Sequence, residues 1–585
     1  MASGLVPGML AVTRQDGVAP SEGLASALST IGVEEPSTID VGGVALAGWG
    51  FDLGGFGPGT PVLLSLTNWR HNGSVDTPQI ARWLDEGAST PLGEMLPPFA
   101  ALGAVDEGVR VAADQMGFRQ IYYASGASWS AVSTSARALA ALGGGGFNLA
   151  ALKLQSQLGW QLGQSTLFRG VTKLAPGEVL TVTADEMRRE RPPEPPLEPI
   201  TLDEAVRRAS RLLREFLERY LDESPDPTLQ LTGGQDSRIL LSAIPRRRRH
   251  GLKVMTVDAP GTGDAELAAH LSGRFGLRHT VQSLDGLAHL SPAQCFESVC
   301  EAASRLDCMA DPLARAATLW AERSLEQGAR LSGLGGEIAR GFYYTGRVTR
   351  RAVTKQRSER LARWRMFANE PVEQAAISPE LARDAVPVAL ESVYRALVAG
   401  NSSWFEATDE LYYRHRMQRW AGLGETAVCL DRSLTNPMLD DRFLAIARAL
   451  SPRDKQGSVF LARLQLELDE ELASIPLDNR PPPRVYADPG SISSVRIRAA
   501  TLRRAAKKAR QRLLRTARPP AGAAVVARGL SQHIRENHEL LDPVRDSGAF
   551  DEQWLDGVAA GRVEPSPGSL ALLANVLVAC RQPSG

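Results

Sequence analysis

The stretch TLQLTGGQDSRILLSA, residues 228–243, constrains the fold of this chain more than any other segment. Residues 228–231 are short, β-prone and alternating, which is typical of a buried strand. Residues 238–243 are rich in helix formers. The sequence therefore predicts a strand, a tight glycine-rich loop over residues 232–237, and the N-terminus of a helix directly after it.

The loop has the composition of an anion-binding site. Glycines let backbone N–H groups approach an anion closely, and the start of a helix favours negative charge. Asp236 would repel a bare phosphate unless a divalent cation lay between the two groups. The loop therefore indicates a Mg²⁺-bound polyphosphate with the metal on Asp236. In the purely structural alternative, Gly233 and Gly234 make a turn, and Asp236 and Ser237 cap the helix.

The length and composition exclude several classes of protein. A chain of 585 residues is too long for one core, so two or three domains are expected. Lys plus Arg equals Asp plus Glu, at 66 each, so no global field favours nucleic acid or membrane partners. The five cysteines form no CxxC motif, which argues against a disulfide framework or a zinc site. The absence of a signal-like or long apolar segment predicts a cytoplasmic protein.

The pattern along the chain changes three times. Residues 1–186 carry glycines and short apolar runs, which predicts a mostly β domain, and the proline-rich residues 187–200 predict a linker. Residues 201–480 alternate amphipathic helices with brief strands, which is typical of an α/β domain with a parallel sheet. Residues 481–585 predict a helical extension. The expected strands are 229–231, 252–257 and 329–332, and the clearest helices are 202–221 and 265–275.

A second glycine-rich turn follows another predicted strand. It reads SGLGGE, residues 332–337, and ligands of parallel sheets bind at the carboxyl ends of the strands.

Two basic stretches have simpler interpretations. Residues 246–250 fit a solvated turn, and residues 502–515 fit a basic helix packed on the domain, because the net charge is zero.

Several motifs occur in the order found in the asparagine synthetase family. Residues 232–237 resemble the pyrophosphate-binding SGGxDS loop of that family. The matching downstream segments are 257–280, 332–344 and 436–450, of which the second is similar to the SGxGxDExxxGY element. Upstream, residues 114–124 and 165–178 are similar to parts of the family's amino-terminal glutaminase domain.

The resemblance implies a fold and a chemistry. The fold is an Ntn-hydrolase-like β-rich sandwich, then an adenine-nucleotide α-hydrolase-like (PP-loop ATP pyrophosphatase) parallel-sheet domain, then a helical carboxyl-terminal part. The chemistry uses ATP and Mg²⁺ to convert a carboxylate into an acyl-adenylate with release of pyrophosphate, and then passes the acyl group to an amine. The partners implied are a small-molecule or peptide carboxylate and an amine.

The motif positions assign roles to individual residues. Asp236 and Glu337 would hold Mg²⁺, with Glu337 in place of the family's aspartate. The remaining nucleotide contacts implied are the backbone of Leu231 and Val257 to adenosine, Ser332 and Gly333 beside the nucleotide, and Thr232, Gly233, Gly234 and Ser237 around pyrophosphate. His279 is interpreted as structural.

Three departures from the family pattern alter the expected function. The family's glutaminase uses an amino-terminal cysteine, exposed after removal of Met1, whereas residue 2 here is Ala2 and the first cysteine is Cys295. Residues 1–186 are therefore expected to be a degenerate glutaminase-like domain, a relic or a docking surface. Leu334 stands where asparagine synthetases carry a glutamate that serves the aspartate substrate, which makes aspartate a doubtful substrate.

The third departure concerns a lysine that counters charge on the leaving groups. Val459 stands near its position, and Lys455, close by in the sequence, could substitute as a catalytic residue. Asp307 and Asp311 are weak candidates for the acceptor pocket and fit solvated loop positions better.

The sequence thus predicts an amide-bond-forming synthetase without glutamine hydrolysis, in specialised-metabolite, antibiotic or peptide natural-product biosynthesis, with possible partner proteins of such a pathway. The alternatives are a lasso-peptide-type macrolactam synthetase and a catalytically degenerate nucleotide-binding scaffold. The TGGxDSR form of the loop differs from the SGGxDS usual in lasso cyclases. A tRNA- or citrulline-directed ATP pyrophosphatase is disfavoured by the glutaminase-like front half.

Overall fold

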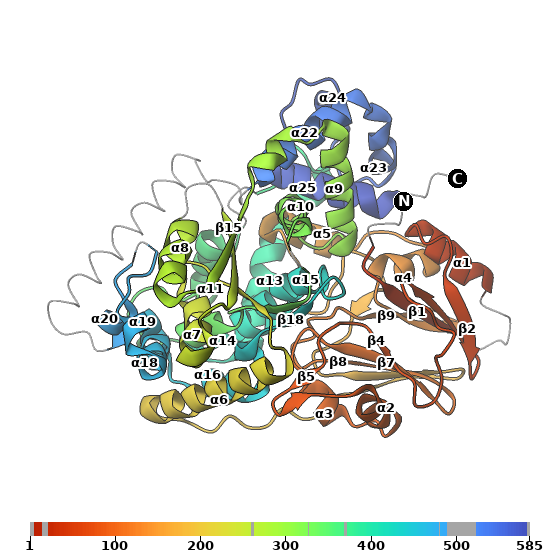
Figure 1. The fold of residues 1–585 in the computed structure, drawn as a ribbon. Helices are drawn as coiled ribbons and strands as arrows, with labels where there is room; N and C mark the ends of the chain where they lie inside the picture. Colours follow the sequence, from red (N-terminus) through yellow and green to blue (C-terminus); the bar gives the residue numbers. More distant parts are fainter. Residues whose placement is uncertain are drawn as a thin grey trace.

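The computed structural model describes residues 5–14, 21–258, 263–325, 327–367, 371–478, 480–487 and 522–581. They form a mixed α/β protein with two antiparallel sheets and one parallel sheet (Figure 1). The basic segment 502–515 lies outside the described residues. Within the described residues, no helix combines the length and the apolar content needed to cross a bilayer.

The amino-terminal region contains the two antiparallel sheets. The first has the strand order β11-β9-β10-β1-β3-β2, and the second has the order β13-β12-β8-β7-β4. The strands of the first sheet are β1 (Gly8–Arg14), β2 (Ser37–Val41), β3 (Val44–Trp49), β9 (Tyr122–Ser125), β10 (Trp129–Ser133) and β11 (Thr172–Lys173). Those of the second are β4 (Val62–Leu63), β7 (Ala100–Val105), β8 (Gly108–Ala113), β12 (Val179–Thr183) and β13 (Met187–Glu190). A short hairpin, β5 (Trp69–Arg70) and β6 (Gly73–Ser74), lies apart.

The two antiparallel sheets stack on each other with helices on both outer faces. Helices α1 (Ser21–Thr30) and α4 (Ala136–Leu142) contact the first sheet, and α2 (Thr77–Asp85) and α3 (Ser89–Gly93) contact the second. Strand β1 is apolar over residues 9–12 because both of its faces are buried. Met9 and Ala11 point into the core between the sheets, while Leu10 and Val12 point to the helix-covered side.

The predicted boundary at residue 186 needs a correction. Strand β13 pairs with β12 from Val179↔Glu190 to Val182↔Met187, so the first residues assigned to the linker belong to the sheet. Met187 packs against the core between the sheets, and Arg188 is exposed. The charges that suggested a linker instead mark a solvent-facing edge strand, where charged side chains are common.

The second half of the chain is built on a parallel sheet with the strand order β16-β15-β14-β17-β18. Its strands are β14 (Thr228–Gln230), β15 (Lys253–Asp258), β16 (Arg278–Ser283), β17 (Ala329–Leu331) and β18 (Ser433–Thr435). The three strands expected from the sequence are thus confirmed to within a residue. In chain order the sheet runs 3-2-1-4-5, so the direction of winding reverses between β14 and β17.

Helices surround this sheet. The first three are α6 (Leu202–Glu223), α7 (Gln235–Ala243) and α8 (Asp264–Phe275), which confirms the two helices expected from periodicity. Helix α7 begins three residues earlier than Arg238, because Gly234 takes the N-cap position and the acidic and hydroxyl residues after it suit a first helical turn. Further helices of this half up to residue 487 are α9 (Pro292–Arg305), α10 (Pro312–Arg323), α11 (Lys355–Leu361), α12 (Pro379–Ala382), α13 (Ala385–Gly400), α14 (Trp404–Leu411), α15 (Gly422–Thr426), α16 (Asp441–Ala449), α17 (Pro452–Lys455), α18 (Val459–Leu468), α19 (Glu470–Ala473) and α20 (Pro483–Ala487). Helix α5 (Leu149–Leu158), from the amino-terminal part of the chain, packs on α13.

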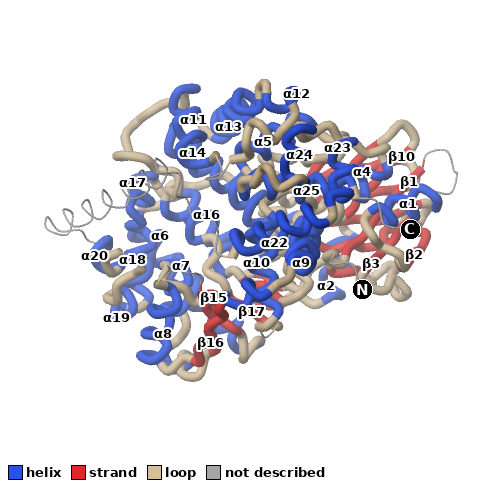
Figure 2. Tube along the Cα trace, turned by 90° about the horizontal axis from the view of Figure 1, so that it is seen from above, coloured by secondary structure: helices blue, strands red, loops and turns tan. Residues whose placement is uncertain are grey.

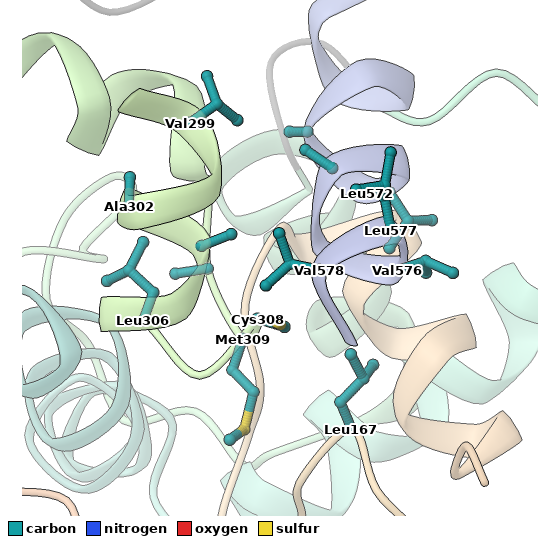
Figure 3. Packing of buried hydrophobic residues seen from close by; sticks show 14 of the residues in the cluster. Leu167, Val299, Ala302, Leu306, Cys308, Met309, Leu572, Val576, Leu577 and Val578 are labelled. Carbon is teal, nitrogen blue, oxygen red and sulfur yellow. The ribbon is translucent and has the colours of Figure 1, made fainter. Parts of the chain in front are cut away.

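The carboxyl-terminal helices belong to the same core as the rest of the chain. Helix α22 (Ala523–Glu536) packs on α9 and α10, and α25 (Pro567–Cys580) packs on α9, α10 and α5. Helices α23 (Asp542–Asp546) and α24 (Glu552–Ala559) complete this layer. Figure 3 shows Val299 of α9 and Leu306, directly after that helix, opposite Val578 of α25, with Leu167 of the amino-terminal region below them. Seen from above, α22 and α25 lie near the middle of the molecule (Figure 2).

Candidate functional site

Both glycine-rich segments found in the sequence lie at the point where the parallel sheet reverses its winding. The first follows β14 and leads into α7, and the second follows β17 and leads into a 3₁₀ turn, η3 (Gly336–Arg340). Strands β14 and β17 are parallel neighbours, so their carboxyl ends open at the same edge. Ligands of open α/β sheets bind at such a crevice. The topology therefore brings together two segments that are about a hundred residues apart.

Glycines allow the η3 turn to lie directly against the loop after β14. A methyl group placed on Gly333 would lie 2.7 Å from the carbonyl carbon of Asp236 and from the amide nitrogen of Ser237. One placed on Gly336 would lie 2.5 Å from Oδ1 of Asp236. No side chain fits at either position, so these glycines permit the close approach of the two segments.

Two carboxylates from the two segments meet at this contact. Arg340 joins them, with its guanidinium 3.3 Å from Oδ2 of Asp236 and 3.0 Å from Oε1 of Glu337. The other oxygens, Oδ1 of Asp236 and Oε2 of Glu337, are buried without a hydrogen-bond partner. Burial, and then the nearby charge of Asp236, raise the pKa of Glu337 to about 7, against the lowering effect of Arg340. The site therefore holds two buried oxygen acceptors that nothing in the described chain satisfies.

The residues present fit a magnesium ion that is bound together with a polyphosphate. Carboxylate oxygens are the protein ligands that Mg²⁺ prefers, and such sites commonly supply one or two carboxylates while phosphates and water complete the shell. The unpartnered oxygens of Asp236 and Glu337 supply that number. Across the described residues, no group of three or more His, Cys, Asp or Glu side chains gathers as a metal cage. The remaining ligands of a bound ion would therefore come from the substrate.

The loop around Asp236 is organised by its own hydroxyl groups. The N–H of Thr232 donates to Oγ of Ser237 at 3.2 Å, and the N–H of Gly234 donates to Oγ1 of Thr232 at 3.1 Å. Helix α7 has no side-chain hydrogen bond at its N-cap. The amides of its first turn therefore have no capping side chain, whereas the N–H groups of Thr232, Gly233 and Gly234 are already bonded within the chain.

Gly233 is held by two acidic residues that sequence analysis did not identify. Its N–H donates to Oδ1 of Asp264 at 2.7 Å, and its carbonyl accepts from the N–H of Asp478 at 3.1 Å. The buried guanidinium of Arg238 donates to the carbonyls of Ile475 and Pro476, at 3.0 and 2.7 Å, and so holds this segment beside the loop. A phosphate that takes the Gly233 N–H must displace the Asp264 carboxylate.

The residues expected to contact adenosine lie at the carboxyl ends of their strands. The N–H of Leu231 donates to the carbonyl of Met255 at 2.9 Å, and its carbonyl accepts from the Thr256 hydroxyl at 2.7 Å, so its N–H is already used within the sheet. Val257 is half-buried near the end of β15. The Thr256 hydroxyl also lies 2.9 Å from Nε2 of His279, consistent with a structural histidine.

Ser332 sets the start of the second segment. Its N–H donates to the carbonyl of Thr435 at the end of β18, at 3.1 Å, and its Oγ accepts from the N–H of Leu334 at 3.3 Å. The side chain of Leu334 packs against the apolar core of this half of the molecule. Leucine at this position therefore contributes packing, not a charge.

Lys455, Asp307 and Asp311 lie in three different surroundings. Lys455 is buried, with Nζ 2.8 Å from Oδ2 of Asp409, and that oxygen also accepts from the Tyr344 hydroxyl at 2.7 Å. Within the described residues it forms no ion pair or hydrogen bond with the carboxylate pair. Asp307 is buried against the amino-terminal region, where it accepts from the N–H of Ala136 at 3.1 Å. Asp311 caps α10 and lines a cavity.

Arg340 is the site residue that sequence analysis missed most clearly. It lies in the same short turn as Glu337, three residues later, and this spacing places both side chains on one face of a 3₁₀ turn. A basic residue so close to a candidate metal ligand was the available signal.

The start of β1, in contrast to the ends of β14 and β17, is closely packed and hydrogen-bonded. The carbonyl of Val6 accepts from the indole N–H of Trp49 at 3.0 Å, and the carbonyl of Pro7 accepts from Arg119 at 2.9 Å. A methyl group on Gly8 would lie 2.0 Å from Oγ1 of Thr134, so the strand end is closely packed. No cysteine precedes Cys295 in the sequence.

Comparisons with known proteins identify no family. No protein-family model matches the chain. No curated protein matches it in sequence. A solved structure of the allosteric regulatory enzyme of purine biosynthesis aligns over 47% of this chain and 80% of its own, with 13% identity and a TM-score of 0.21. At that score the alignment carries no argument about fold or function.

Proposed function

We propose that the chain is an ATP-dependent synthetase that forms an amide bond, without hydrolysing glutamine. A single observation carries the proposal. The carboxylates of Asp236 and Glu337 come from two loops at the switch point of a 3-2-1-4-5 parallel sheet, and each keeps one buried oxygen without a partner. Such an arrangement suits a metal-bound polyphosphate beside a helix N-terminus.

The proposed reaction has two steps. In the first, a carboxylate oxygen of the acid attacks the α-phosphorus of ATP, and the bond from that phosphorus to the bridging oxygen breaks as pyrophosphate leaves. In the second, an amine nitrogen attacks the acyl carbon, the acyl–oxygen bond breaks as AMP leaves, and the amine gives up a proton. Mg²⁺, when bound, neutralises charge on the departing pyrophosphate.

The chain's own residues bind and orient in this scheme. Asp236 and Glu337 hold the metal, and the amides of the first turn of α7 face the phosphates. Gly333 and Gly336 allow the two segments to touch, so that both carboxylates would bind the same ion. Arg340, already bound to both carboxylates, stabilises the pair when no metal is present.

The amino-terminal sandwich is proposed to be a glutaminase-like domain that lost its chemistry. Two stacked antiparallel sheets with helices on both outer faces are the layout of Ntn-hydrolase-type domains. The start of β1, where a nucleophile would precede the strand, is filled by packed backbone and by the Trp49 indole. The amine is therefore proposed to come from outside this domain.

Pyrophosphate release tests the proposal. The chain is incubated with ATP and Mg²⁺ and a panel of small-molecule and linear peptide carboxylates, with and without an added amine, and pyrophosphate and AMP are measured. Release that depends on one class of carboxylate is the expected result. ATP that binds without any release across the panel contradicts it.

A nucleotide-binding scaffold is the second candidate, and one set of contacts favours it. Arg340 already bridges the carboxylates, Asp264 occupies the Gly233 N–H, and Lys455 is paired with Asp409. These contacts stabilise a nucleotide-free state. Saturable ATP binding without turnover, combined with a nucleotide-dependent change in protease sensitivity, would support the scaffold over the enzyme.

A further inference from the structure

A cavity of about 330 Å³ lies between the amino-terminal region, the η3 turn and the carboxyl-terminal helix α25. Its wall includes residues of α5, of the loop before α10, of two π-helical segments, η4 (Ala362–Met366) and η5 (Tyr412–Ala421), and of α25. Its aromatic lining residues are Trp160, Phe342, Tyr343, Phe367 and Trp420. The volume is in the range of small-molecule sites, and the lining is mostly apolar, as in such sites.

One cation on the cavity wall has no anionic partner. The guanidinium of Arg416 lies 3.7 Å from the ring centroid of Trp420 and 5.3 Å from that of Trp160. Within the described residues it makes no ion pair and no hydrogen bond, and contact with the two rings is what holds it. A guanidinium stays charged in proteins, and a charge that is taken out of water without a partner is costly. A cavity that keeps such a group exposed to its interior is suited to an anionic ligand.

A carboxylate lies on the same cavity wall. Oδ1 of Asp311 caps α10 by accepting from the N–H of Leu313 at 2.9 Å and of Ala314 at 3.4 Å. Those two bonds use one oxygen and leave the other without a hydrogen-bond partner within the described residues. Arg365, a second cation of the wall, donates to the carbonyl of Phe342 at 2.8 Å. The cavity thus combines an unpaired cation, a partly available anion and apolar surface.

A layer of aromatic side chains separates the cavity from the carboxylate pair. Phe342 and Tyr343 line it and follow Arg340 almost directly in the chain. The ring of Tyr412 packs between, 4.6 Å from that of Phe342 and 5.6 Å from that of Tyr343. Burial, and next the charge of Glu337, raise the pKa of Tyr412, which places its hydroxyl within the field of the site. A ligand in the cavity is therefore adjacent to the proposed reaction centre and separated from it by the side chains of this layer.

We propose that this cavity binds a free α-amino acid with an aromatic or branched apolar side chain, its carboxylate on Arg416 and its ammonium group on Asp311. The proposal rests on the proposed function in one respect: the amino acid is assigned as the amine that accepts the acyl group. The carboxylate is engaged by Arg416 in this arrangement, so it is an anchor and not the group that attacks phosphorus. The binding itself requires neither ATP nor Mg²⁺.

Calorimetric titration of the full chain, without nucleotide, tests the binding. L-phenylalanine, L-tryptophan and L-leucine are compared with phenylalanine amide, which lacks the carboxylate, and with N-acetylphenylalanine, which lacks the ammonium group. Each of the two modified ligands is expected to bind about 10- to 100-fold more weakly than free phenylalanine, because each loses one charge-assisted contact. Equal affinity for phenylalanine and its amide overturns the proposal.

Substitutions on the wall give an independent test. Arg416→Gln should weaken phenylalanine binding about 10- to 100-fold and leave the affinity for phenylalanine amide nearly unchanged. The exposed Arg383→Gln is the matched control, and Arg416→Lys, which keeps the charge, should recover part of the affinity. Thermal unfolding of each variant shows whether it folds. Undiminished phenylalanine binding in folded Arg416→Gln, or no saturable binding by the parent chain up to about 10 mM, overturns the proposal.

The assignment as acceptor is tested separately from the proposed function. Pyrophosphate release without any amine reports activation of the acid alone, and failure there counts against the proposed function. If the acid is activated, transfer of the acyl group to phenylalanine supports the acceptor role. Activation with phenylalanine bound but never acylated overturns that role.

Discussion

An aspartate follows a strand in each half of the molecule, and the two differ in how their oxygens are satisfied. Asp114, just after β8, accepts from the N–H groups of Phe99, Met116 and Phe118, so both of its oxygens are bonded. Asp236, after β14, keeps Oδ1 buried and without a partner. Asp114 uses its charge to fix the turns around it. Asp236 keeps acceptor capacity that only a ligand can satisfy, and this is where chemistry is expected.

The same contrast holds between the start of β1 and the carboxyl ends of β14 and β17. The start of β1 is filled by side chains and hydrogen-bonded backbone. The carboxyl ends of β14 and β17 are instead followed by glycines and by carboxylate oxygens that have no hydrogen-bond partner. Within one chain, satisfied polar groups thus mark the region whose chemistry is proposed to be lost. Unsatisfied ones mark the region proposed to retain it.

The sharpest way to break this comparison is to change both aspartates to asparagine. Asp236→Asn should lower pyrophosphate release by at least about 100-fold with little change in stability, because it removes a charged metal ligand that bonds little of the protein. Asp114→Asn should cost about 1–3 kcal/mol of stability, because an amide cannot accept from three N–H donors, while turnover per folded molecule stays near that of the parent. Pyrophosphate assays and urea unfolding measure the two effects. A reversed pattern would remove Asp236 from the mechanism.

Arg340 balances the charge of Asp236 and Glu337, so a substitution of Arg340 tests how these carboxylates bind a metal. Arg340→Gln removes a cation that competes with the metal, so Mg²⁺ in the presence of a non-hydrolysable ATP analogue should bind about 10-fold more tightly. Calorimetric titration with Mg²⁺ measures this, and the exposed Arg383→Gln is the control. Weaker Mg²⁺ binding in Arg340→Gln would show instead that the guanidinium acts on the phosphates.

The junction of the two halves should respond to acid. The N–H of Gly163 in the amino-terminal region donates to Nδ1 of His415 in η5 at 3.0 Å, and burial, then the charges of Arg419 and Arg414, lower the pKa of His415 from 6.5 to about 4. The unfolded chain therefore binds a proton that the folded chain does not. Stability is full above pH 6.5 and falls as the pH drops towards 4, by about 1.4 kcal/mol for each unit crossed.

His415→Gln keeps an acceptor for Gly163 and should flatten this pH dependence. Urea unfolding over the same pH window compares it with the parent chain and with His289→Gln, which changes an exposed histidine. An unchanged slope in His415→Gln would assign the acid sensitivity to other groups.

The smallest expected effect concerns glutamine. If the amino-terminal sandwich has lost its nucleophile, added glutamine should yield no glutamate and should not replace the free amine in amide formation. Amino-acid analysis after incubation with ATP, Mg²⁺ and the acid measures this. Glutamate above the level of a heat-denatured sample would show that this half retains its chemistry.

Local patterns predicted much of the parallel-sheet half. Short apolar runs between glycine-rich turns located β14, β15 and β17, and amphipathic periodicity located α6 and α8. The linker boundary was misplaced, because β13 is a charged edge strand and its composition resembles that of a linker. The role of Asp264 was missed because it depends on a contact between segments, which no spacing in the sequence encodes, whereas the three-residue spacing of Glu337 and Arg340 was a local signal.

The sequence by itself determined that a glycine-rich loop with one aspartate joins a strand to a helix, because backbone sterics and helix capping act over a few residues. Motif position already paired Glu337 with Asp236, and only the tertiary structure decided that Arg340 lies between them and that Lys455 is bound to Asp409. These contacts depend on the order of strands in the sheet. Strand order is settled by burial over the whole chain, so it has no local signature.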